Sequence, residues 1–512
     1  MKKMQKLLLL PLVVALSGCT YINLFDDGEK TEPEIEIPTE QGVNKINARY
    51  TYKEYSANNA YPLSSCPSVG SPKLLVIPIW FEDSTNYIDL NKRETVRKDI
   101  QNAYFGTSIE TGWESVSSYY KKDSFGKLDL SGTVSEWYEC GYDSDRFYEE
   151  EAGMEATVDL VSEATEWYFS NHSDSRKSYD FDGDGYLDGV MLIYASPDYA
   201  SMDNDYASNM WAYCYWVQSL SKKNVNKPGE NVFFWASYDF MYSSGIPTRL
   251  RVGSFYGGGD NSICEIDAHT YIHEMGHVFG LSDYYDYTGK ASPAGGFSMQ
   301  DMNVGGHDPY SRFSLGWANP YLPTETTELV VRDIESSGEC VVLAYDGYDG
   351  SPFDEYIIIE LYTPYGLNEF DSKYAYGGAY PKGPKAYGAR VWHIDSRLFS
   401  YTTNKVTTST KAGYVTHATT NTSSGKKGYS LNLAGRYEYN QNHLIRAKKS
   451  ETYSSASMLS ESSLFMQGDK FSLSDYSSQF YNGKFNSGVT FNWKVEFKEI
   501  AKNGMKIVCT KK

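Results

Sequence analysis

The chain has 512 residues, of which 41% are hydrophobic and 22% are charged, and its formal net charge is −19 at pH 7. This composition is typical of a folded protein and excludes a disordered one, and the length favours two or more domains. The negative charge excludes nucleic acid as an expected partner, because phosphate groups would be repelled.

The first residues have the pattern of an export signal. Three lysines precede an apolar run from Leu7 to Leu16, which is too short to span a bilayer. The run leads into Ser17-Gly18-Cys19, which is similar to a bacterial lipobox, where the cysteine is acylated. We therefore expect residues 1–18 to be a lipoprotein signal peptide and Cys19 to be lipidated. The protein would be extracytoplasmic and would contact the bacterial cell membrane only through this lipid anchor. An ordinary signal peptide with an incidental cysteine is the alternative.

Residues 19–45 are expected to form an acidic tether. Between Asp26 and Gly42 there are seven acidic residues, one lysine and two prolines. Such a segment cannot bury a core, so we expect it to be extended and mobile.

Six further cysteines leave two interpretations open. They show no C-x-x-C spacing, which argues against a cysteine zinc site. Disulfides are compatible with an extracytoplasmic location, and isolated buried thiols are the alternative. The six are Cys66, Cys140, Cys214, Cys264, Cys340 and Cys509.

Hydrophobic patterns predict an α+β fold in two parts, residues 46–320 and a β-rich region at residues 321–512. In the first part, strands are expected at 74–81, 127–138 and 190–194, and helices at 91–105, 115–120 and 151–169. Residues 195–262 are expected to be rich in loops. In the second part, strands are expected at 356–361, 389–394 and 490–497, and a long surface loop at 401–430.

An acidic loop precedes the strand expected at 190–194. Asp180, Asp182, Asp184 and Asp188 alternate with other residues, and Gly185 permits a sharp bend. Alternating carboxylates of this kind wrap a hard cation such as Ca²⁺. Position 12 of the loop is a methionine where an EF-hand has glutamate, so the loop is not an EF-hand. An Asp/Gly turn without an ion is the alternative.

A second motif predicts a zinc site. His273-Glu274-Met275-Gly276-His277 places two histidines four residues apart, on one face of a helix, where both imidazoles can bind one ion. Glu274 would face the attacking water as a general base and would not be a ligand.

The residues after this motif supply a candidate third ligand. Gly280 can adopt the left-handed conformation that ends a helix, and the resulting turn would bring Asp283 back to the metal. Three protein ligands leave one position for water, as catalytic zinc requires. The alternatives to Asp283 as the third zinc ligand are Glu360, His307 and His393.

Other residues near the motif have weaker interpretations. His269 lies one turn earlier and is expected to support the site or lie at the surface. Met299 is the preferred residue for a methionine-containing turn beneath the zinc, and Met302 is the alternative. Tyr310 is a candidate partner for the reaction oxyanion, although a structural tyrosine is the more ordinary reading in a chain with 46 of them.

Six segments carry a resemblance to a known family. They are residues 76–83, 119–130, 180–188, 273–286, 306–317 and 355–395. They resemble the immune inhibitor A family of secreted bacterial zinc metallopeptidases over about residues 72–400. One departure is Ser298, where relatives often have aspartate. The resemblance implies a metzincin-type catalytic domain, in which a mixed sheet lies over the zinc helix and Met299 belongs to the Met-turn.

We therefore expect a secreted or surface-anchored zinc endopeptidase that cleaves protein or peptide substrates, with Zn²⁺ and Ca²⁺ as cofactors. Glu274 would transfer the protons. Two other classes remain open, a catalytically inactive surface adhesin on the same scaffold and a zinc hydrolase of a non-peptide substrate.

Overall fold

The computed structural model describes residues 34–512 apart from 57–63, 65, 112, 200–207, 218–222, 243–265, 374–379, 403–404, 408–413, 418 and 423–438. Residues 34–512 form one compact unit. Within the described ranges, no helix has both the length and the apolar character needed to cross a bilayer. The expected signal peptide, Cys19 and Cys264 lie outside the described residues.

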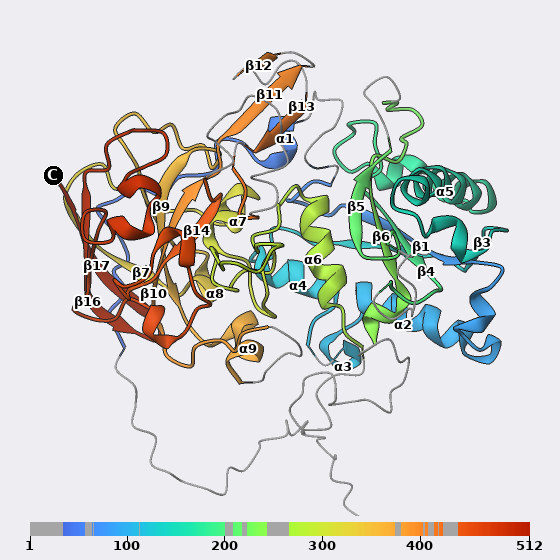
Figure 1. Cartoon of the computed structure of the whole chain (residues 1–512), viewed down its shortest axis with the longest axis horizontal. Coiled ribbons are helices and arrows are strands. Elements are labelled where there is room, and N and C mark those ends of the chain that lie inside the picture. The colour runs from blue at the N-terminus through green and yellow to red at the C-terminus, as the bar shows by residue number, and fades with distance from the viewer. Residues whose placement is uncertain are drawn as a thin grey trace, which may run out of the picture. The chain divides into compact units, whose positions relative to one another are not determined.

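A six-stranded mixed sheet forms the centre of the first part of the chain (Figure 1). Its strands are β1 (Lys73–Trp80), β2 (Ser131–Val134), β3 (Tyr138–Glu139), β4 (Gly189–Tyr194), β5 (Tyr213–Trp216) and β6 (Val232–Ser237). Their order is β2-β1-β4-β6-β5, with β3 also paired to β1. The pairs are parallel except that β5 runs antiparallel to β6.

The expectation that residues 195–262 are rich in loops is wrong for β5 and β6. All six residues of β6 are buried, so the strand shows no alternation of apolar and polar positions. A short strand covered on both faces cannot be recognised from periodicity alone, because nothing in it faces water.

Helices cover both faces of this sheet (Figure 1). On one face pack α2 (Arg93–Phe105), α4 (Val116–Asp123) and α6 (His269–Val278). The other face is covered by α5 (Glu150–Asn171). Short helices α1 (Tyr52–Ser56) and α3 (Ser108–Thr111) complete this part. The helices expected at 91–105, 115–120 and 151–169 are confirmed as α2, α4 and α5, and each buries apolar residues against the sheet.

The second part of the chain is β-rich, as expected. One antiparallel sheet has the order β14-β10-β9-β8 and another has the order β15-β16-β17-β7. Apolar residues of both sheets share one core, so the two sheets pack face to face. The strands are β7 (Thr327–Arg332), β8 (Val341–Leu343), β9 (Glu355–Tyr362), β10 (Gly388–Asp395), β14 (Asn442–Ile445), β15 (Lys470–Ser472), β16 (Trp493–Ala501) and β17 (Gly504–Lys511). Short helices α7 (Pro309–Ser314), α8 (Ile334–Ser337) and α9 (Glu369–Lys373) lie between strands or before them.

The prediction of a long surface loop at residues 401–430 is also wrong in part. The strands β11 (Leu398–Thr402), β12 (Lys405–Thr407) and β13 (Tyr414–His417) form a small antiparallel sheet there. The segment is rich in threonine, which suits a strand because it is β-branched, although its polarity resembles that of a loop.

The segment expected to be a mobile tether is packed over residues 34–45. Ile35 is only 5% exposed, and its amide donates to the side chain of Asn503 at 3.0 Å. Farther along, Gln41 exchanges hydrogen bonds with the main chain of Val330. The acidic composition drew attention away from two isoleucines, Ile35 and Ile37. Both pack on the C-terminal region. The expected boundary at residue 320 stays a prediction.

Candidate metal centre

Helix α6 brings together the histidines of the predicted zinc motif. One donor atom from each of His273, Glu274 and His277 lies within 4.8 Å of the others. The helix places them there because residues at i and i+4 share one face. The residues Ile272, Met275 and Phe279, at most 1% exposed, bury the opposite face. The helix therefore has a packing side and, opposite it, a side that carries the candidate ligands.

Asp283 completes the cluster. Its Oδ1 atom lies 3.1 Å from Nε2 of His273 and 3.2 Å from Nε2 of His277. Gly280 makes this return possible, because the helix ends at Val278 and Gly280 has φ of +101°. The amide of Leu281 then bonds to the carbonyl of Gly276 at 3.0 Å, which closes the turn.

The second nitrogen of each histidine is bonded to the main chain. Nδ1 of His273 donates to the carbonyl of Met299 at 2.7 Å. Nδ1 of His277 donates to the carbonyl of Leu281 at 2.8 Å. In a neutral ring, a proton on Nδ1 leaves the Nε2 lone pair available for a metal ion beside Asp283. The phenol of Tyr287 donates to the other oxygen of Asp283 and holds that carboxylate in place.

Glu274 is buried beside this cluster at 7% exposure. Strand β5 covers it, and the thiol of Cys214 lies 3.2 Å from the carbonyl of Glu274 and 3.9 Å from its Oε2 atom. Burial raises the pKa of the Glu274 carboxyl, while the neighbouring histidines lower it by a smaller amount. A carboxylate with a raised pKa is suited to take up and return a proton. The Cys214 contact depends on the pairing of β5 with β6, and no sequence motif pointed to it.

The charges of the cluster favour a cation. Burial alone would lower the pKa of His277, but the Asp283 carboxylate outweighs it and raises this pKa to about 10. Burial would likewise raise the pKa of Asp283, yet the two histidines hold it well below its usual range. The site therefore stabilises positive charge between these three side chains.

The donor set fits zinc. Tetrahedral zinc binds nitrogen and oxygen at about 2.0–2.2 Å, which separates neighbouring donors by roughly 3.3–3.5 Å. The separations of 3.1 and 3.2 Å between Asp283 and the histidines are close to that. Two neutral imidazoles and one carboxylate form a three-ligand set of the kind that leaves a fourth position for water.

The rival ligands are bonded elsewhere. Glu360 forms an ion pair with Arg390 at 2.7 Å and accepts a hydrogen bond from Trp392 at 2.9 Å. His393 is paired with Glu355 at 2.8 Å. The remaining rival, His307, contacts Asp123 at 2.7 Å and Gln300 at 3.2 Å. Among the three rivals and Asp283, the structure brings only Asp283 to the histidines.

The structure also shows the contacts of His269, Met299 and Tyr310, which the sequence suggested as further site residues. His269 is buried, so it does not lie at the surface, and its Nε2 contacts the carbonyl of Asn303 at 2.8 Å. Met299 is fully buried in the core beneath α6 and fixes His273 through its carbonyl. The hydroxyl of Tyr310 is 2.7 Å from that of Tyr52, within the protein core. The suggested contact of Tyr310 with the reaction centre is therefore replaced by a structural bond.

The acidic loop forms a second cluster, in which Asp180, Asp182 and Asp184 are close enough to hold a metal ion. However, the ammonium of Lys53 lies 3.0 Å from Asp184 and 3.4 Å from Asp182. Asp188 points inward and accepts from the amides of Phe181 and Lys73. A buried lysine thus already supplies positive charge to the loop, a contact between distant segments that the loop sequence alone could not reveal.

The cysteines that the structure describes are free thiols. They are Cys66, Cys140, Cys214, Cys340 and Cys509. The alternative of isolated thiols is therefore observed for these five.

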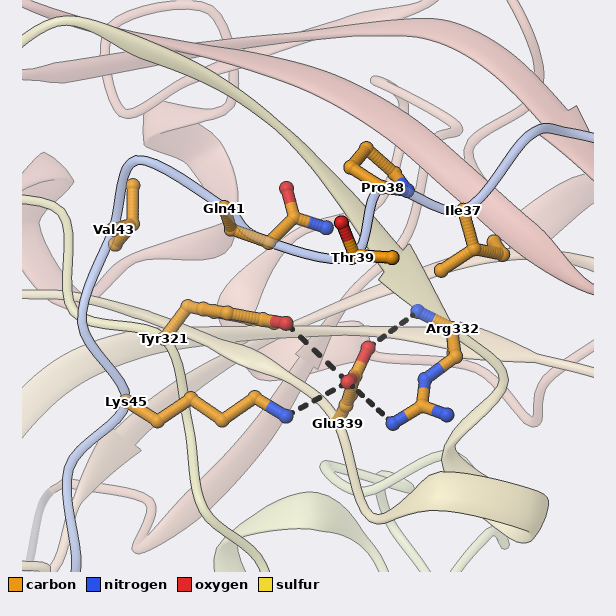
Figure 2. Close-up of a pocket in the computed structure, with 9 residues that line it drawn as sticks. All are labelled: Ile37, Pro38, Thr39, Gln41, Val43, Lys45, Tyr321, Arg332 and Glu339. Carbon is orange, nitrogen blue, oxygen red and sulfur yellow. Dashed lines mark hydrogen bonds and ion pairs between the residues drawn. The ribbon is translucent and has the colours of Figure 1, made fainter.

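A pocket of about 530 Å³ lies away from the residues of the metal cluster, between the N-terminal segment and the C-terminal region (Figure 2). Its wall includes Glu339, which accepts from Lys45 at 2.7 Å, from Arg332 at 2.8 Å and from Tyr321 at 3.3 Å. The remaining lining residues are Ile37, Pro38, Thr39, Gln41 and Val43. The one carboxylate of this pocket is therefore paired with both of its cations.

Comparison with known proteins places the first part of the chain. Residues 64–241 match the family model for the catalytic domain of the immune inhibitor A peptidase M6. The match spans the sheet from β1 to β6 and ends before α6. No curated protein matches the chain. Residues 64–241 are therefore similar to the peptidase domain of the immune inhibitor A family.

Proposed function

We propose that the chain is a zinc endopeptidase whose active site is formed by His273, His277, Asp283 and Glu274. The observation that carries the proposal is the convergence of Asp283 on the Nε2 atoms of both histidines at 3.1 and 3.2 Å. The family match supports peptide bonds as the substrate.

Each side chain has a separate role. His273, His277 and Asp283 would hold the ion, and zinc when bound supplies a Lewis acid that polarises the scissile carbonyl and makes water more acidic. Glu274 accepts a proton from the attacking water and returns it to the leaving amine. The metzincin description of this site, with Met299 in the Met-turn, belongs to the same proposal.

Strand β5 is the proposed docking site for the substrate backbone. It lies at the edge of the sheet, packs against α6 and, among the described strands, pairs only with β6. A strand in this position has main-chain groups that an extended peptide can pair with. The scissile bond would then pass over Glu274, which Cys214 of β5 already contacts.

Digestion of a peptide library, read by mass spectrometry with and without a zinc chelator, tests the proposal. We expect cleavage that the chelator stops and that added zinc restores. A zinc-loaded protein that cleaves no peptide in the library would favour a binding protein or a hydrolase of another substrate.

The lipid anchor is a further proposal, supported by the sequence from Leu7 to Cys19. Substitution of Cys19 by alanine should block lipidation and release the protein from the membrane fraction, because the lipid on this cysteine is the proposed anchor. Cell fractionation and metabolic labelling with a fatty acid measure this. Unchanged membrane association and labelling would show another mode of attachment.

Calcium binding at Asp180–Asp188 is proposed in a modified form, because Lys53 competes for the same carboxylates. With a dissociation constant of ~10⁻³ M, 10⁻² M calcium would stabilise the fold by about 1.4 kcal/mol. We expect calcium to raise the melting temperature more in Lys53→Met than in the parent, since the ammonium is removed. The variant Asp182→Ala/Asp184→Ala should abolish both responses. Equal responses in Lys53→Met and the parent would contradict competition.

A further inference from the structure

Side chains outside α6 hold its metal-binding turn. Three successive carbonyls of this turn each accept a hydrogen bond from a different neighbouring segment. The pairs are Tyr120 to Ile272 (2.7 Å), Gln300 to His273 (3.1 Å) and Cys214 to Glu274 (3.2 Å). Of the three, only the bond from Gln300 reaches a residue that the cluster assigns to the metal.

The orientation of the Gln300 amide follows from two of its partners, His273 and His307. The carbonyl of His273 can only accept, so the amide nitrogen of Gln300 faces it. The amide oxygen then faces Nε2 of His307 at 3.2 Å, and this ring nitrogen must donate. Gln300 and His307 are both fully buried, so water cannot replace either bond.

A buried network holds His307 in turn. Its Nδ1 lies 2.7 Å from Oδ2 of Asp123, and its main-chain amide donates to Oδ1 of the same carboxylate at 3.2 Å. Arg312 contacts Asp123 and Glu335, each at 2.6 Å. Asp123, His307 and Arg312 are each at most 1% exposed, so their contacts are shielded from water. A network of this kind is rigid, because any displacement leaves a buried charge unpaired.

The second glycine of the zinc motif fits the same arrangement. A Cβ atom at residue 276 would lie 2.1 Å from Oε1 of Gln300. Glycine inside a helix costs about 1 kcal/mol relative to alanine. The close approach of Gln300 gives a reason for glycine here, and it shows that the amide lies directly against the turn between the two histidines.

We propose that Gln300 is a positioning residue for the metal ligand His273. The loop holds this histidine at two points, because the carbonyl of Met299 bonds to its ring and the amide of Gln300 bonds to its main chain. The charged network behind His307 keeps the amide in place. This inference rests on the proposed zinc site, and it makes zinc affinity depend on a residue that does not touch the ion.

The test compares two buried glutamines. Gln300→Met retains an unbranched side chain of similar length but loses both hydrogen bonds. Gln479→Met is the matched control, since Gln479 is also fully buried and bridges the main chain of Arg446 with both ends of its amide. Competition with a chromogenic chelator measures the zinc dissociation constant of each variant, and thermal unfolding of the zinc-free proteins measures stability. We expect zinc to bind about 10–100-fold more weakly to Gln300→Met, and Gln479→Met to bind it as the parent does.

Coupling with residue 276 supplies a second measurement. Gly276→Ala should weaken zinc binding in the parent, because its Cβ would clash with Gln300. In the Gln300→Ala background the clash is absent, so Gly276→Ala should cause little further loss of zinc affinity. Three outcomes would each overturn the inference: full additivity of the two changes, an unchanged zinc dissociation constant in Gln300→Met, or an equal loss of zinc affinity in Gln479→Met. If the parent protein binds zinc, these outcomes leave the proposed function standing. A parent that binds no zinc would instead overturn the proposed function, and the inference with it.

Discussion

Replacement of Glu274 by alanine is expected to lower kcat/KM for peptide hydrolysis by about 10²–10⁴-fold or more, which is the usual contribution of a general base. Zinc content should stay at the parent value, because the metal ligands are the two histidines and Asp283. The fold should tolerate the change, since a buried carboxyl whose pKa is raised by burial is costly to keep charged. Kinetics on one cleaved peptide, with metal analysis of the same sample, measure both quantities.

The variant Glu274→Gln is the matched control for this prediction. It retains the size of the side chain and the contact with Cys214 but cannot accept the proton. Both variants should therefore be inactive to a similar degree. If either retains activity within about tenfold of the parent, Glu274 is not the base. If the alanine variant loses zinc together with activity, Glu274 acts as a ligand and the assignment of roles in the cluster is wrong.

Substitution of Asp283 by alanine is expected to reduce zinc affinity by more than the about 10–100-fold that outer-sphere changes cause. Asp283 supplies the only negative charge among the three proposed ligands, and it contacts both histidines. Without it the remaining imidazoles would hold the ion by two bonds. Zinc content after dialysis, followed by chelator competition, measures the loss.

Substitutions at two neighbours of Asp283 serve as comparisons for the loss of zinc affinity. Tyr287→Phe removes only the hydroxyl that donates to Asp283, so the loss of zinc affinity should be about 10–100-fold. Asp286→Ala changes a carboxylate in the same loop that bonds to Thr288, and it should leave zinc binding unchanged. Glu360→Gln, at a rival position paired with Arg390, should also keep zinc. If Asp283→Ala holds zinc as tightly as the parent, the proposed three-ligand site is wrong.

Local patterns were sufficient to predict the metal-binding helix and its turn. The spacing of His273 and His277 determines that both side chains share a helical face, whatever surrounds the helix. Gly280 is required by a local backbone conformation, and the short segment to Asp283 limits where that carboxylate can reach. Long helices and alternating strands were also recognisable, because their periodicity is a property of the segment itself.

Contacts between distant segments decided the rest. The central strand β6 shows no periodicity because both of its faces are buried by other parts of the chain. Lys53 reaches the acidic loop across more than a hundred residues, and Ile35 is buried only because the C-terminal region lies beside it.

The residues around the candidate site also reach it through contacts between distant segments. Cys214 contacts Glu274 only through the placement of β5, and Gln300 contacts α6 only because His307 and Asp123 hold it there. The sequence by itself therefore determined which side chains are candidates to bind zinc and to move protons. Tertiary structure decided which groups orient them, since a hydrogen bond between remote residues depends on how the whole chain packs and leaves no spacing pattern in the sequence.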